Sequence, residues 1–130
     1  MVQATGMVRQ CPIIAIVDDD PAVCGSLKFS LELEGFAVRA YASGAEFFSA
    51  DDFDACNCLV VDQRMPGMSG MELIAKLRDR RIATPAILVT SQPNSALRAH
   101  AAKANVPIVE KPLLGNALLE RIREACSRGR

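Results

Sequence analysis

Three short runs of the chain are apolar at nearly every position, and each is followed by polar residues and then by a stretch with helical spacing. These runs cover residues 13–17, 58–61 and 86–89. Such an alternation is typical of repeated βα units around a parallel sheet. Strands that are apolar throughout need cover on both faces, so we predict that these three lie in the middle of the sheet.

Two further segments have the pattern of edge strands. Residues 36–41 alternate and are interrupted by Arg39, and residues 107–109 are short and begin with proline. Both features are typical of strands at the edge of a sheet. Together the five strands predict an α/β fold, a doubly wound sheet in the order 2-1-3-4-5, with its ligand site at the carboxyl ends of the central strands.

The first two helices have clear start signals. Asp20 is suited to be an N-cap before Pro21, and Gly35 ends the first helix. Its predicted apolar face consists of Val23, Leu27, Leu31 and Leu33. A capping-box spacing from Ser43 to Glu46 predicts the start of the second helix.

Three more helices follow. Ser69, or the turn at 67–70, opens the third, and we expect four of its residues to point inward: Met71, Leu73, Ile74 and Leu77. The fourth, 94–104, is rich in alanine and only weakly apolar. The fifth is predicted over 114–126, with Leu118, Leu119 and Ile122 inward.

Size and charge narrow the class of protein. The 130 residues fit one domain, with a core over about 12–126 and tails at 1–11 and 127–130. Fifteen basic residues balance fifteen acidic ones, so no overall field favours nucleic acid or an anionic membrane. The chain lacks both a signal-peptide core and an uncharged run of the ~20 residues that span a bilayer, so we expect a cytoplasmic protein.

The five cysteines do not suggest a disulfide framework, because they are odd in number and irregularly spaced. Cys56 and Cys58 lack a second ligand cluster, so a thiol metal site is not favoured. His100 has no partner at helical spacing and is interpreted as a surface residue.

Acidic residues follow two strands that are predicted to be neighbours. Asp18, Asp19 and Asp20 come after the first strand, and Asp62 comes after the third. Carboxylates 4 Å apart repel by about 4 kcal/mol at an effective dielectric near 20, so such a group requires a cation. Oxygen ligands with room for water favour Mg²⁺. Helix capping explains Asp20 better than metal binding does.

The next two strand ends add a hydroxyl and an ammonium group, from Thr90 and Lys111. A carboxylate can attack phosphorus while Mg²⁺ and a lysine neutralise the equatorial oxygens and a hydroxyl donates a hydrogen bond. The four strand ends therefore predict a site for phosphoryl chemistry.

Four motifs in order resemble the receiver domains of response regulators, and the third-strand motif is most similar to the FixJ/NarL-type branch. The motifs are IVDDD at 16–20, VVDQRMPGMSG at 60–70, LVTS at 88–91 and VEKP at 109–112. The resemblance runs from residue 13 to about 123 and implies a flavodoxin-like (βα)₅ fold.

The resemblance also implies a role for each matching residue. Asp62 would be the phosphoacceptor, with Thr90 and Lys111 on the phosphoryl oxygens. Mg²⁺ would be held by Asp62, by Asp19 directly, by Asp18 through water and by the backbone carbonyl of Arg64. The bond between Lys111 and Pro112 is expected to be cis.

The implied function is a switch. A sensor histidine kinase or phosphotransfer protein would phosphorylate the domain, which would assist its own phosphorylation and dephosphorylation without being an enzyme acting on other substrates. Since the chain ends after the fifth helix, we expect a stand-alone receiver that acts on a downstream protein, without direct nucleic-acid or membrane binding. Self-association as a homodimer stays open.

One departure from the family pattern keeps a second interpretation open. Many receivers carry Phe or Tyr where this chain has Ile108, so the chain could instead be an interaction module that is never phosphorylated. A hydrolase of the haloacid-dehalogenase type would want an acid two residues after Asp62, where the chain has Arg64. The segment 91–95 and the weakly apolar fourth helix are predicted to be the mobile part.

Overall fold

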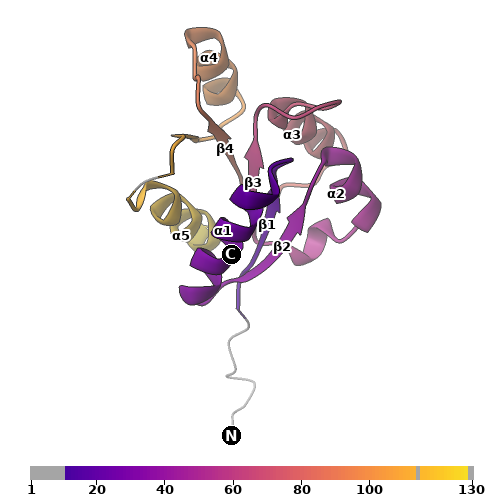
Figure 1. The fold of residues 1–130 in the computed structure, drawn as a ribbon. Helices are drawn as coiled ribbons and strands as arrows, with labels where there is room; N and C mark the ends of the chain where they lie inside the picture. The colour runs from indigo at the N-terminus through magenta and orange to yellow at the C-terminus, as the bar shows by residue number, and fades with distance from the viewer. Residues whose placement is uncertain (1–10, 114, 129–130) are drawn as a thin grey trace, which may run out of the picture.

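The computed structural model describes residues 11–113 and 115–128 and contains one five-stranded parallel sheet (Figure 1). The strand order is β2-β1-β3-β4-β5, as the apolar pattern predicted. β3 and β4 are buried at every position, which is why their sequences are apolar throughout. The strands are β1 (Ile13–Val17), β2 (Ala37–Tyr41), β3 (Cys58–Asp62), β4 (Ala86–Thr90) and β5 (Ile108–Glu110).

Helices cover both faces of the sheet. In Figure 1, α1 and α5 lie on one side of it, and α2 and α3 lie on the other. The first pair packs over a core that includes Leu31, Leu118 and Ile122, and the second over a core that includes Phe47 and Leu73. The helices are α1 (Pro21–Leu33), α2 (Gly44–Ala50), α3 (Gly70–Asp79), α4 (Ser95–Lys103) and α5 (Ala117–Arg128), with a 3₁₀ helix, η2, at Phe53–Ala55.

The predicted N-caps of three helices are confirmed. Asp20 accepts a hydrogen bond from the N–H of Ala22, with Pro21 in the first turn of α1. Ser69 starts α3 with a complete capping box, because its hydroxyl accepts from the N–H of Glu72 and the Glu72 carboxylate accepts from the N–H of Ser69. Asn94 caps α4. These caps fix where the polar loops at the carboxyl ends of the strands stop.

Three details of the helix prediction are wrong. Leu33 is 72% exposed, so it does not belong to the buried face of α1. The carboxylate of Glu46 accepts from the N–H of Ala42, so the capping box of α2 is incomplete. The fifth helix begins at Ala117 and runs to Arg128, because Gly115 adopts a left-handed backbone with φ of 71° just before it.

The remaining predictions about the chain as a whole have mixed outcomes. Residues 1–10, 114 and 129–130, which include most of the predicted N-terminal tail and half of the predicted C-terminal tail, lie outside the described residues. The cysteines are free thiols, and Cys56 and Cys58 are buried. His100 is exposed, as expected. No described helix has the length and apolarity needed to cross a bilayer.

Candidate functional site

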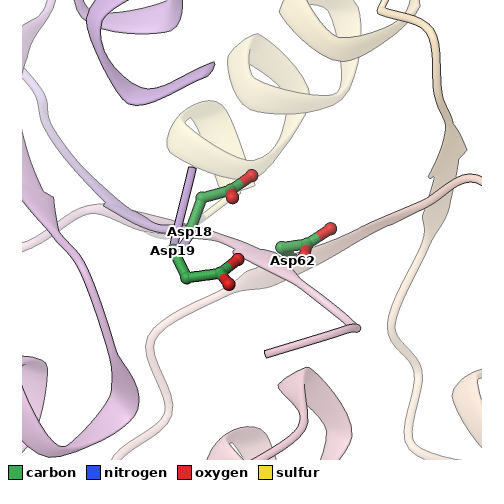
Figure 2. A group of neighbouring side chains, drawn as sticks. All are labelled: Asp18, Asp19 and Asp62. Atoms are coloured by element: carbon green, nitrogen blue, oxygen red, sulfur yellow. The ribbon is translucent and has the colours of Figure 1, made fainter. Parts of the chain in front are cut away.

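The carboxyl ends of β1 and β3 bring three carboxylates together. Asp18 and Asp19 directly follow β1, and Asp62 is the last residue of β3, which pairs with β1. One carboxylate oxygen from each of the three lies within 4.8 Å of the others (Figure 2). The predicted convergence of these residues is therefore confirmed. Asp20 does not belong to the group, because its side chain caps α1.

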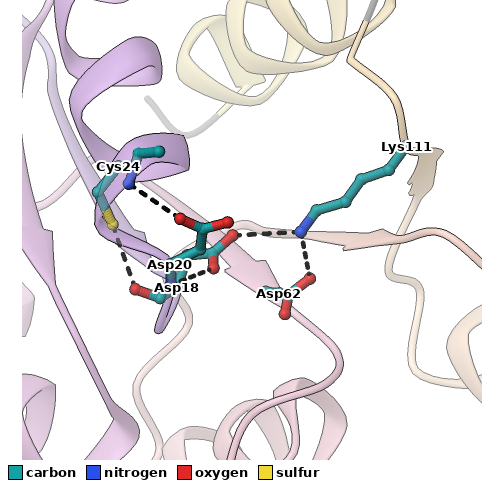
Figure 3. A network of polar contacts seen from close by, with 6 residues as sticks. Asp18, Asp20, Cys24, Asp62 and Lys111 are labelled. Atoms are coloured by element: carbon teal, nitrogen blue, oxygen red, sulfur yellow. Dashed lines mark hydrogen bonds and ion pairs between the residues drawn. The ribbon is translucent and has the colours of Figure 1, made fainter.

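Backbone and side-chain hydrogen bonds fix the turn after β1. The N–H of Asp18 donates to the carbonyl of Tyr41 at 3.1 Å, and its carboxylate accepts from the N–H of Asp20 at 2.9 Å. The thiol of Cys24 donates to the Asp18 carbonyl at 3.2 Å (Figure 3). Asp18 is consequently buried, with 4% of its surface exposed, while Asp19 is exposed.

A lysine from the loop after β5 bridges two of the carboxylates. The Nζ of Lys111 lies 3.0 Å from an oxygen of Asp62 and 3.4 Å from an oxygen of Asp18, as Figure 3 shows. The backbone N–H of Lys111 donates to the carbonyl of Thr90 at 2.9 Å, which ties this loop to the end of β4. The peptide bond between Lys111 and Pro112 is cis, as expected.

The electrostatics of the site oppose a fully ionised carboxylate group. Burial raises the pKa of Asp62, the hydrogen bond from Lys111 lowers it, and the negative charge of Asp18 raises it further, with a net increase. Burial lowers the pKa of Lys111, but its contacts with Asp62 and Asp18 outweigh that effect and leave the pKa raised. The site thus holds three carboxylates against one ammonium group, a balance that attracts a cation.

The donor set suits Mg²⁺. All three side chains of the group offer carboxylate oxygens, and no thiol or imidazole belongs to it. Mg²⁺ prefers such oxygens, is bound through few carboxylates and keeps several waters, so an open site at a loop edge fits it.

Thr90 lies at the end of the strand that pairs with β3, and Arg64 lies two residues after Asp62. Thr90 ends β4 and is 2% exposed, and its hydroxyl accepts from the N–H of Gln92 at 3.3 Å. Arg64 is exposed on the loop between β3 and α3. Both residues line an open cavity of about 650 Å³ between that loop and the start of α4, together with Gln63.

Two contacts near the site could not be predicted from the sequence. The side chain of Gln63 accepts a hydrogen bond from the N–H of Met71 at 3.0 Å, and the thiol of Cys24 reaches the backbone of Asp18. Neither residue type has a positional rule that would predict such a bond, because each depends on how a loop closes onto a helix.

Comparison with known proteins identifies the family. The family model of the response regulator receiver domain matches residues 14–123. The chain belongs to the response regulator receiver domains. It is 41% identical over 114 residues to the transcriptional regulatory protein FixJ of Rhizobium meliloti (strain 1021), an alignment that covers 86% of this chain and 55% of that protein. This receiver domain thus spans about half the length of the curated relative.

Solved receiver structures agree with this assignment. The crystal structure of FixJ-N aligns over 92% of this chain and 96% of its own, with a TM-score of 0.81 and 37% sequence identity. The CheY-like receiver domain protein from Methanospirillum hungatei JF-1 aligns over 92% and 97%, with a TM-score of 0.83 and 30% identity. The predicted fold and the predicted resemblance to the FixJ branch are both confirmed.

Proposed function

We propose that Asp62 is the phosphoacceptor of this receiver and that a sensor histidine kinase or phosphotransfer protein supplies the phosphoryl group. The observation that carries the proposal is the grouping of Asp18, Asp19 and Asp62 around one ammonium group, Lys111, at the carboxyl edge of the sheet. A structural ion pair would need one carboxylate for one lysine. Two additional carboxylates, one of them buried, carry negative charge that Lys111 does not balance, and a divalent cation would balance it.

The transfer itself needs little from the protein beyond positioning and charge. A carboxylate oxygen of Asp62 attacks phosphorus, the bond between phosphorus and the imidazole nitrogen of the donor breaks, and the nitrogen keeps the electron pair. Lys111 leaves its pairing with Asp18 and neutralises a phosphoryl oxygen. Asp18, Asp19, Asp62 and the Arg64 carbonyl would hold Mg²⁺, which when bound supplies charge neutralisation for the phosphoryl oxygens.

Phosphorylation would change the position of the residue at the end of β4. A phosphoryl group brings about −1.5 to −2 charges at pH 7. The Thr90 hydroxyl accepts a hydrogen bond from the N–H of Gln92 and can donate its own proton toward the phosphoryl group. A shift of Thr90 would move the following loop and α4, in which Ala101 is the buried residue. We propose that this face contacts a downstream protein.

The proposal is tested by phosphorylation with acetyl phosphate, followed by intact-mass spectrometry. We expect Mg²⁺-dependent addition of one acid-labile phosphate to the wild-type protein and none to Asp62→Asn. Asp54→Asn is the control, because Asp54 is exposed and lies outside the carboxylate group. If Asp62→Asn were labelled as well as the wild type, the site would be wrong. If no variant were labelled, the interpretation as a non-phosphorylated interaction module would replace the proposal.

The same samples address the fate of the phosphate. We propose that the domain assists its own dephosphorylation, with water reaching phosphorus through the open cavity beside Thr90. Loss of the label after removal of acetyl phosphate should then slow when Mg²⁺ is chelated. Loss at an equal rate with and without Mg²⁺ would argue against assistance by this site.

A further inference from the structure

The loop between β3 and α3 is fastened by the residue that follows the proposed phosphoacceptor. The N–H of Gln63 donates to the carbonyl of Val89 at 2.9 Å, and the carbonyl of Gln63 accepts from the N–H of Gly70 at 3.1 Å. The side-chain oxygen of Gln63 accepts from the N–H of Met71 at 3.0 Å. One residue therefore joins the loop to β4 on one side and to the first turn of α3 on the other.

The start of α3 is also pressed against the backbone of Asp62. A Cβ atom at Gly70 would lie 2.8 Å from the Asp62 carbonyl oxygen and 2.7 Å from a methyl carbon of Leu88. This close contact prevents α3 from moving toward β3. The two hydrogen bonds accepted by Gln63 prevent it from moving away, so both ends of the loop are held at one place.

Arg64 is the first residue beyond this fastened point. Within the described part of the chain, the hydrogen bonds of the loop lie at its ends, at Gln63 and Ser69. The N–H of Arg64 shares a peptide plane with the Gln63 carbonyl, and that plane is fixed by the bond to Gly70. The Arg64 carbonyl belongs to the next peptide plane, so its direction depends on where Gln63 holds the loop and on the φ and ψ of Arg64.

We propose that the side chain of Gln63 is a positioning residue for Mg²⁺. By accepting the N–H of Met71 it holds the loop in the conformation that presents the Arg64 backbone carbonyl to the group formed by Asp18, Asp19 and Asp62. This inference rests on the proposed function, since it takes that group as the metal site. Gln63 itself would not be a ligand of the metal, because its side-chain oxygen is bonded to Met71.

The test compares Mg²⁺ binding by isothermal titration calorimetry in variants that lose different hydrogen bonds. Gln63→Leu removes the acceptor for Met71 at similar side-chain size, and Ser69→Ala removes the acceptor for the N–H of Glu72 at the same helix start. Both lose one bond of similar strength, so a general loosening of α3 would affect them alike. We expect the dissociation constant to rise about tenfold in Gln63→Leu and less than about twofold in Ser69→Ala, because residues that orient metal ligands affect affinity by ~10-fold or more.

A third variant separates the hydrogen bond from side-chain size. Gln63→Glu keeps an acceptor oxygen, so the Met71 amide should stay protected from hydrogen exchange and Mg²⁺ binding should be retained. Loss of binding in Gln63→Glu equal to that in Gln63→Leu would overturn the inference. If Gln63→Leu does not fold, Gln63→Asn, whose shorter side chain cannot reach Met71, takes its place.

The outcomes distinguish this inference from the proposed function. If the wild-type protein did not bind Mg²⁺, the proposed function would fail and this inference with it. If the wild type bound Mg²⁺ and Gln63→Leu bound it as tightly as Ser69→Ala, the positioning role would be wrong while the metal site would stand.

Discussion

Replacing Asp62 with asparagine should make the metal-free protein more stable. Asp62 is 6% exposed, and one of its carboxylate oxygens lies within 4.8 Å of a carboxylate oxygen of Asp18 and of Asp19. Asparagine has nearly the same shape, and its carbonyl oxygen can still accept from Lys111, which lies 3.0 Å from Asp62. The substitution therefore removes a buried charge and its repulsions while it keeps the packing and one hydrogen bond.

The magnitude follows from the distances. At an effective dielectric near 20, each repulsion across 4.8 Å is about 3.5 kcal/mol and the attraction to Lys111 across 3.0 Å is about 5.5 kcal/mol. The balance is about 1.5 kcal/mol against the ionised carboxylate. Solvent around the exposed Asp19 reduces that figure and the burial of Asp62 increases it. We expect a gain of about 1–2 kcal/mol, or a rise in Tm of roughly 3–8 °C for a domain of this size.

The assay is thermal unfolding at pH 7 with EDTA and then with Mg²⁺. Asp54→Asn is the control for loss of an exposed carboxylate and should leave Tm unchanged within about 1 °C, since surface substitutions have small effects. Mg²⁺ at 100 times its dissociation constant should stabilise the wild type by about 2.7 kcal/mol and Asp62→Asn by less. The stability order of the two proteins should then approach equality or reverse.

One result would refute this reasoning. That result is a loss of more than about 1 kcal/mol of metal-free stability in Asp62→Asn. The attraction between Lys111 and Asp62 would then outweigh the repulsion and the cost of burial, which contradicts the raised pKa of Asp62. Equal stabilisation of both proteins by Mg²⁺ would separately show that position 62 is not a metal ligand.

Further predictions concern pH, the lysine and two glycines. The folded-state pKa of Asp62 is raised, so its contribution to stability is present below its unfolded pKa of about 3.9 and is lost as pH rises through the folded value. Thermal melts without metal should therefore show the stability advantage of Asp62→Asn growing from pH 4 to pH 7. An advantage that stays constant over this range would contradict the sign of the pKa shift. Lys111→Met should lower the metal-free Tm more in the wild type than in Asp62→Asn, where Lys111 loses an ion pair but keeps its contact with Asp18, a difference that a double-mutant cycle measures; additive effects would mean that Lys111 and Asp62 do not interact as an ion pair. Gly70→Ala should cost about 1–3 kcal/mol in denaturant unfolding through overpacking. Gly25→Ala, a helix position with no atom within 4 Å of the added methyl, should gain about 0.5–1 kcal/mol; equal signs for the two would refute the steric argument.

The residues that could be predicted from the sequence are those whose place depends on strand pairing. Asp18, Asp19 and Asp62 converge because β1 and β3 are neighbours and parallel, and the apolar pattern alone predicts that arrangement. Lys111 could be placed at the same edge for the same reason. Sequence could not give its distances to two carboxylates, because those depend on the path of the loop after β5.

Other features depend on contacts that periodicity does not describe. Leu33 has the right spacing for the buried stripe of α1, but it lies at the last residue of the helix and is left exposed. The spacing from Ser43 to Glu46 fits a capping box, yet the Glu46 carboxylate accepts from the N–H of Ala42, one residue before Ser43. The role of Gln63 needs the closed loop, since its partner Met71 is eight residues away.

The shallow attachment of α4 has a practical consequence. Ala101 is its buried residue and Leu97 only packs at the edge of the core, whereas α3 buries five residues. An α4 taken from another receiver, or a fluorescent reporter attached to its outer side, should therefore cost little folding free energy. The helix offers an insertion point for an engineered biosensor, and α3 does not.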